Sequence, residues 1–94
     1  MNIRFFIDPE AGQPHIHNHG VTEEEVRQIL ARPGLTLDGR RNSRIALGQT
    51  SVGRYLKFVY VPSRDEPGIF VITAYELRGK ERRAYRRRRR RGFK

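Results

Sequence analysis

Two segments, residues 54–61 and 68–75, carry the strongest structural signal in the sequence. Both are dense in β-branched and aromatic residues, which fit the pleated, half-buried surface of a sheet. The segment between them, residues 62–68, is polar and contains two prolines, as is typical of a hairpin loop. We therefore predict a hairpin at the centre of a small sheet, to which other elements add at the edges or on one face.

The rest of the chain supplies a helix and further strands around this hairpin. Thr22 and Glu25 form the capping-box pattern at the start of a helix over residues 23–32, which ends at a Pro-Gly pair. Further strands are predicted at residues 2–7, 35–37 and 43–50. This order predicts an α+β fold: a small antiparallel sheet of about four to five strands with one helix packed on one face and a basic C-terminal helix.

Alternation sorts the side chains of the hairpin onto two faces. We assign one set to the core beneath the helix: Leu56, Phe58, Tyr60, Phe70, Ile72 and Ala74. The open face then carries Tyr55, Lys57, Thr73 and Tyr75, with Arg54 at its rim. Aromatic rings interleaved with cations suit base stacking and phosphate neutralisation. The same residues are also compatible with ordinary cross-strand pairs on a hydrated sheet face.

Charge divides the chain into two parts. Residues 1–77 contain nine basic and nine acidic side chains, whereas residues 78–94 contain eleven basic side chains and one acidic one, which accounts for the net charge of +10. We accordingly divide the single domain into an α+β body, residues 1–79, and a basic helix or tail, residues 80–94. Such a block predicts a polyanionic partner with strongly salt-dependent binding, either nucleic acid or an acidic protein. An anionic membrane surface is a weaker alternative, and a solvated tail without a specific role is another.

Several functional classes are excluded or disfavoured by the composition. The chain has no cysteine, so disulfides and thiolate metal sites are excluded. It has no long apolar run and no signal-peptide pattern, from which we expect a cytoplasmic protein without a membrane partner. His15, His17 and His19 alternate in a loop, but no cysteine or carboxylate completes an obvious metal set. We favour turn histidines, one of them catalytic, over a metal site, and we expect no cofactor and no small-molecule ligand.

Short motifs along the chain resemble the BrnT-like toxins, which belong to the wider RelE/ParE-type group of bacterial toxin–antitoxin systems. In order, they are HGV at 19–21, ALGQT at 46–50, GR at 53–54, VY at 59–60, VITA at 71–74 and KERRAY at 80–85. Together they extend over about residues 8–88. The resemblance implies a compact fold, cleavage of mRNA on or off the ribosome, and neutralisation by a partner antitoxin.

In RNases of this kind a ribose 2′-hydroxyl attacks the adjacent phosphate, so the enzyme supplies a base, an acid and cations and needs no metal. The resemblance implies that Arg54 and the basic block stabilise charge. Candidate proton-transfer or orienting groups, from their expected position, are His19, Lys57, Tyr75 and Glu76. Candidate nucleic-acid contacts are Arg78, Lys80, Arg82, Arg83, Tyr85, Arg86, Arg87 and Arg88.

One position departs from the resemblance, because Tyr75 stands where BrnT-like sequences commonly have arginine. The loss of this cation at the sheet face weakens the case for catalysis more than the case for the fold. The alternative is therefore a module of the same fold that binds RNA or an acidic protein and breaks no bond.

Overall fold

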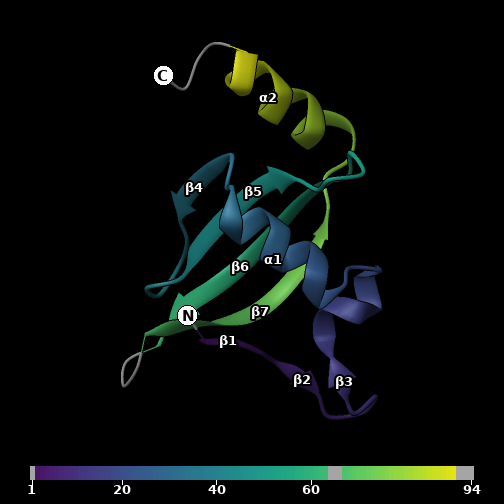
Figure 1. Ribbon diagram of the computed structural model, residues 1–94, viewed down its shortest axis with the longest axis vertical. Helices are drawn as coiled ribbons and strands as arrows, with labels where there is room; N and C mark the ends of the chain where they lie inside the picture. Colours follow the sequence, from purple (N-terminus) through teal and green to yellow (C-terminus); the bar gives the residue numbers. More distant parts are fainter. Residues whose placement is uncertain (1, 64–66, 91–94) are drawn as a thin grey trace.

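The computed structural model describes residues 2–63 and 67–90, and it has the predicted α+β architecture. A five-stranded sheet with the order β1-β7-β6-β5-β4 forms the body (Figure 1). Its strands are β1 (Asn2–Phe5), β4 (Leu35–Asp38), β5 (Arg44–Gln49), β6 (Tyr55–Pro62) and β7 (Gly68–Glu76). The helices are the 3-10 helix η1 (His15–His19), α1 (Glu23–Ala31) and α2 (Gly79–Arg90). A second, two-stranded sheet joins β2 (Ile7–Asp8) to β3 (Gln13–Pro14).

Strands β4 to β7 form the predicted antiparallel meander, but β1 lies parallel to β7, so the prediction of a purely antiparallel sheet is wrong for this strand. No hairpin fixes the direction of β1, because residues 6–67 separate it from its partner. The strand also ends at Phe5, where its pairing reaches Val71. Beyond that point η1 packs beside the second half of β7.

Helix α1 covers one face of the sheet, as predicted (Figure 1). The capping box is formed, because the Glu25 amide donates to Thr22 Oγ1 at 3.2 Å and the Thr22 amide donates to Glu25 Oε1 at 3.0 Å. Val26 and Ile29 are fully buried beneath the helix. Gly48 lets the helix approach, since a Cβ at this position would lie 2.8 Å from Ile29.

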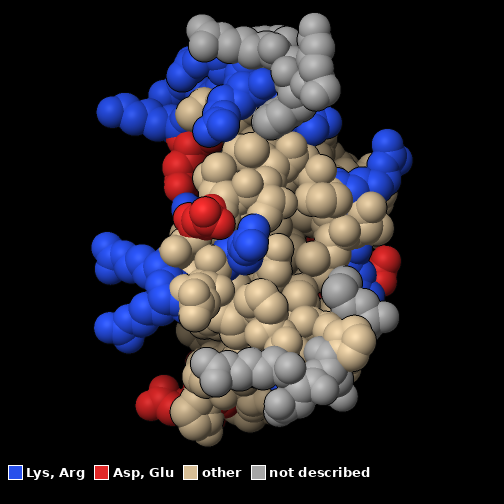
Figure 2. Space-filling model, turned by 90° about the vertical axis from the view of Figure 1, so that its left-hand side faces the viewer, with Lys and Arg blue, Asp and Glu red and all other residues tan. Residues whose placement is uncertain are grey.

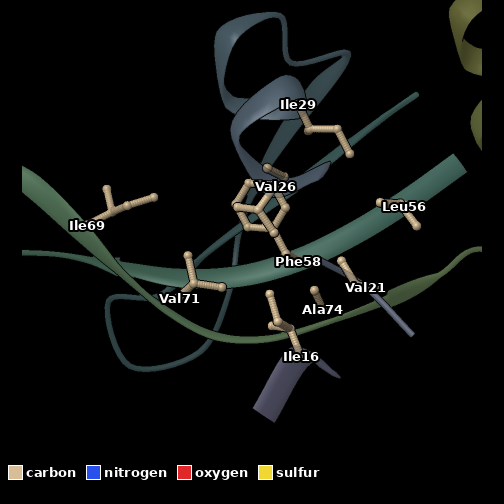
Figure 3. Close-up of a cluster of buried hydrophobic side chains, with 10 residues drawn as sticks. Ile16, Val21, Val26, Ile29, Leu56, Phe58, Ile69, Val71 and Ala74 are labelled. Atoms are coloured by element: carbon tan, nitrogen blue, oxygen red, sulfur yellow. The ribbon is translucent and has the colours of Figure 1, made fainter. Parts of the chain in front are cut away.

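The core contains a different set of β7 side chains from the one predicted. Figure 3 shows the buried cluster between α1, η1 and the sheet, to which β7 contributes Ile69, Val71 and Ala74. The assignment of Phe70 and Ile72 to the core is therefore wrong, and Ile72 is exposed. The cause is a register shift: Val59 pairs with Thr73 while Tyr60 pairs with Val71, which leaves Ile72 as an extra residue. Such a bulge reverses the alternation on one side of it.

Helix α2 leaves the end of β7 and lies at one extreme of the molecule (Figure 1). It attaches to the face of the sheet opposite α1 through a small second core, in which Tyr85 packs with Leu47 and Leu77. It therefore covers one end of that face and leaves the rest uncovered. Among the residues described, no helix combines the length and apolar character needed to cross a membrane.

Candidate functional site

Lys57, Tyr75 and His19 come together on the face of the sheet that α1 does not cover. Lys57 and Tyr75 are direct cross-strand partners on β6 and β7, and the Lys57 Nζ lies 5.2 Å from the centre of the Tyr75 ring. The His19 ring stands edge-on to Tyr75, with the ring centres 6.0 Å apart. Because Ile16 of η1 is buried in the core, η1 holds His19 in this position. We call Lys57, Tyr75 and His19 the central cluster.

The other two histidines of η1 have different surroundings. The His15 ring lies 5.3 Å from the His19 ring, and it extends the row of aromatic rings toward Phe6. His17 instead contacts Glu23, with Nε2 and Oε1 2.7 Å apart. The hydrogen bond to His17 lowers the pKa of Glu23. Within the described parts of the chain, no three histidine or carboxylate side chains gather as a metal site requires.

The ammonium group of Lys57 has a carboxylate partner from α2. Its Nζ lies 3.0 Å from Glu81 Oε2, and 19% of the Lys57 side chain remains exposed. Partial burial lowers the pKa of Lys57, but hydrogen bonds to Tyr75 and Glu81 outweigh this effect and raise the pKa overall. Lys57 is therefore a cation at neutral pH, which suits it to stabilising negative charge rather than accepting a proton.

Arg54 and Glu76 lie at the rim of the cluster and belong to an ion-pair network with α1. The Arg54 guanidinium lies 2.7 Å from Glu25 Oε2 and 3.6 Å from Glu76 Oε1, and it donates to the Gly20 carbonyl at 3.2 Å. Glu76 also contacts Arg78 at 3.5 Å. The network ties the start of α1 to the ends of β6 and β7. Arg54 is thus already neutralised by carboxylates, which the sequence did not indicate.

Tyr85, which the sequence placed among the nucleic-acid contacts, is an anchor of α2. Its side chain is 4% exposed, and burial raises the pKa of its hydroxyl. The missing Cβ of Gly34 makes room for the hydroxyl, since a Cβ there would overlap it. A single aromatic side chain within a run of arginines was the sequence signal for this role.

The other predicted contacts, on α2 and at Arg78 just before it, are exposed, and Figure 2 shows basic side chains gathered at the end of the molecule where α2 lies. Exposed residues of this set are Arg78, Lys80, Arg82, Arg83, Arg86, Arg87 and Arg88. Arg82 and Arg86 lie over the Tyr55 ring, and their guanidinium carbons are 5.8 Å and 5.9 Å, respectively, from the ring centre. Their contact with a sheet residue fixes two of the basic groups relative to the body.

A cleft of about 700 Å³ lies between the end of α1, the turn from β5 to β6, and α2. Arg32, Arg86 and Arg89 contribute cations to its lining, beside Tyr55 and Tyr85. Arg89 donates to the Gly34 carbonyl at 3.3 Å. Arg32 was not a functional candidate from the sequence, and Arg89 was included only as part of the basic block and not among the candidate contacts. Helical spacing could have grouped Arg82, Arg86 and Arg89, since these positions share one side of a helix.

No protein-family model matches the chain, and no curated protein matches it in sequence.

Proposed function

We propose that the protein is a toxin-type endoribonuclease that cleaves mRNA in the cytoplasm without a metal ion and is neutralised by an acidic antitoxin. The observation that supports this proposal is the convergence of Lys57, Tyr75 and His19 on an uncovered sheet face beside the basic helix α2. A cation, a phenol and an imidazole in one place provide the groups that RNA transesterification requires. The resemblance to the BrnT-like toxins points to the same chemistry.

The proposed reaction begins with the ribose 2′-hydroxyl of the bound RNA. Its oxygen attacks the adjacent phosphorus, and its proton passes to the His19 imidazole. The bond from phosphorus to the 5′-oxygen breaks, and the Tyr75 hydroxyl protonates this oxygen as it leaves. The products are a 2′,3′-cyclic phosphate and a 5′-hydroxyl. The Lys57 ammonium stabilises the negative charge that develops on the phosphoryl oxygens, in agreement with its raised pKa.

Arg54 and Glu76 support this arrangement from the rim. The Arg54 guanidinium holds Glu76 at the end of β7, directly after Tyr75, and so helps to position the catalytic tyrosine. The exposed arginines of α2 supply the attraction for the RNA backbone. An acidic antitoxin would compete for the same arginines, since its carboxylates have the same charge as phosphates.

Cleavage of a single-stranded RNA in the presence of EDTA, with and without ribosomes, tests the proposal. We expect His19→Ala, Tyr75→Phe and Lys57→Met each to slow cleavage by about 10²-fold or more, the usual contribution of an acid–base group or of one charge-stabilising donor. His17→Ala is the matched control, because His17 belongs to the same η1 helix but contacts Glu23. Cleavage that is equally fast in all four variants, or that is absent with the wild-type chain under both conditions, would refute the proposal.

A non-catalytic binding module is the second candidate, and one observation favours it. Lys57 and Arg54 both contact carboxylates already, which leaves less positive charge for a transition state. Such a module would capture RNA or an acidic protein through α2 alone. The two candidates differ in their response to conditions: an acid–base mechanism gives a rate that changes with pH, whereas charge capture depends mainly on salt.

A further inference from the structure

The cleft between α1 and α2 has the charge of an anion site. We call it the arginine groove and define it by Arg32, Arg86, Arg89, Tyr55 and Tyr85. Among the described residues that line it, none is acidic. Its volume of about 700 Å³ lies within the range of small-molecule sites, and so accommodates a nucleotide.

The cations of the groove are positioned by contacts with the body of the protein. The guanidinium of Arg86 lies over the Tyr55 ring, and Arg89 donates to the carbonyl of Gly34. Arg32 stands at the C-cap of α1, on the other side of the groove. The three cations therefore come from two helices, and folding brings them to one cleft. Basic groups that are held in place lose less freedom on binding than those of a free tail.

The groove is separate from the central cluster. On α2, Glu81 lies about one turn before Tyr85 and Arg89 about one turn after it, so the two residues are about 12 Å apart along the helix axis at 1.5 Å per residue. Glu81 contacts Lys57, whereas Arg89 lines the groove. The two sites thus lie about two turns apart along the same helix.

We propose that the arginine groove binds the backbone of single-stranded nucleic acid, with each arginine against a backbone phosphate and a base against the Tyr55 and guanidinium surface. Aromatic rings and guanidinium planes provide stacking surfaces for unpaired bases, which an acidic peptide lacks. The inference rests on the proposed function only in naming RNA as the natural polymer. The groove then holds a part of the strand away from the bond that is cut.

Fluorescence anisotropy with a labelled 2′-O-methyl RNA of roughly ten nucleotides tests this site, because this probe binds without being cleaved. The test variant is Arg86→Ala with Arg89→Ala. The matched control is Arg83→Ala with Arg87→Ala, which removes the same charge from the side of α2 opposite Tyr85. We expect the groove pair to weaken binding at least about tenfold and to reduce the slope of log affinity against log salt by about 1.4, twice the value for one single-strand phosphate. The control pair should reduce the affinity by a clearly smaller factor.

A second variant tests whether the effect of the groove pair arises only because the substitutions disrupt helix α2. Arg32→Ala removes a groove cation that belongs to α1 and leaves the sequence of α2 intact. It should weaken binding of the same probe by about threefold or more and reduce the salt slope by about 0.7. Thermal melts followed by circular dichroism establish that each variant is folded.

Two results would overturn the groove proposal. Equal losses in the groove pair and the control pair would show that binding follows net charge alone. Polyglutamate binding that is as tight as that of the RNA and as sensitive to the groove pair would instead show an acidic-peptide site. Lys57→Met separates this inference from the nuclease proposal, because it should slow cleavage by about 10²-fold or more and leave the effect of the groove pair in place. Groove binding without any wild-type cleavage would refute the nuclease proposal alone, and cleavage without groove dependence would refute the groove alone.

Discussion

The Lys57 ammonium group lies 3.0 Å from the Glu81 carboxylate, so the one acidic residue of α2 pairs with the lysine of the central cluster. This contact links the basic helix to the middle of the sheet. It also gives Lys57 a counter-ion that RNA must replace. We infer that Glu81 competes with phosphate for Lys57.

Replacing Glu81 with glutamine tests this competition. The Glu81 side chain is 52% exposed. Its ion pair with Lys57 should therefore contribute less than about 1 kcal/mol to the free energy of unfolding, measured in urea. Affinity for the 2′-O-methyl RNA probe should rise by about threefold or more, since a carboxylate no longer opposes the phosphate. Weaker RNA binding by Glu81→Gln would show that the pair serves to position α2 rather than to mask Lys57.

The fit between Gly34 and Tyr85 leads to a second prediction. An alanine at Gly34 would place its Cβ on the Tyr85 hydroxyl, so Gly34→Ala should destabilise the protein by about 1–3 kcal/mol, as overpacked sites do. The cost should fall to below about 1 kcal/mol when Tyr85 is already alanine, because only the Leu47 carbonyl oxygen, 3.3 Å from the new Cβ, then remains close. Urea unfolding of the two single variants and the double variant measures this coupling. Additive costs would mean that Tyr85 does not contact Gly34.

Alkaline pH should loosen the second core. Burial raises the pKa of Tyr85 above its ordinary value of 10.0, so the unfolded chain loses this proton at a lower pH than the folded one. The associated stability is present below pH 10.0 and is lost as the pH rises toward the folded-state pKa. We therefore expect the free energy of unfolding to fall more steeply above this pH in the wild type than in Tyr85→Phe. Equal slopes in the two proteins would contradict the burial of this hydroxyl.

Arg54 should matter for stability as well as for RNA cleavage. It contacts Glu25, which is only 14% exposed in its side chain and completes the capping box of α1. Arg54→Ala should cost about 1–2 kcal/mol, between the values for exposed and buried pairs. Arg44→Ala is the control, because its pair with Asp38 at 3.7 Å is largely exposed and should contribute less than about 0.5 kcal/mol. Equal changes in the two urea midpoints would show that the Arg54 network is not structural.

Local sequence signals predicted those parts of the fold that local physics determines. Thr22 and Glu25 located the start of α1, because both capping partners lie within one turn of the chain. Alternation placed Leu56 and Phe58 in the core correctly. It failed at Ile72, because a bulge depends on how two strands pair and leaves no mark on the alternation of either one. The parallel direction of β1 is likewise decided by contacts distant in sequence.

The candidate site was predictable in part for the same reason. Lys57 and Tyr75 met as expected, because the hairpin register brings them opposite each other. The approach of His19 depends on the burial of Ile16, and the pairing of Lys57 with Glu81 depends on where Tyr85 docks α2. Both are tertiary contacts that a single sequence does not reveal.

The chemical ends of the RNA fragments show whether the protein cleaves RNA by attack of the 2′-hydroxyl. The purified protein is incubated with a single-stranded RNA and EDTA, with and without ribosomes, and the new RNA ends are identified by mass spectrometry. We expect a 2′,3′-cyclic phosphate on one fragment and a 5′-hydroxyl on the other, with formation slowed by about 10²-fold or more in Tyr75→Phe. Intact RNA under both conditions, or fragments with 5′-phosphate ends, would contradict this mechanism.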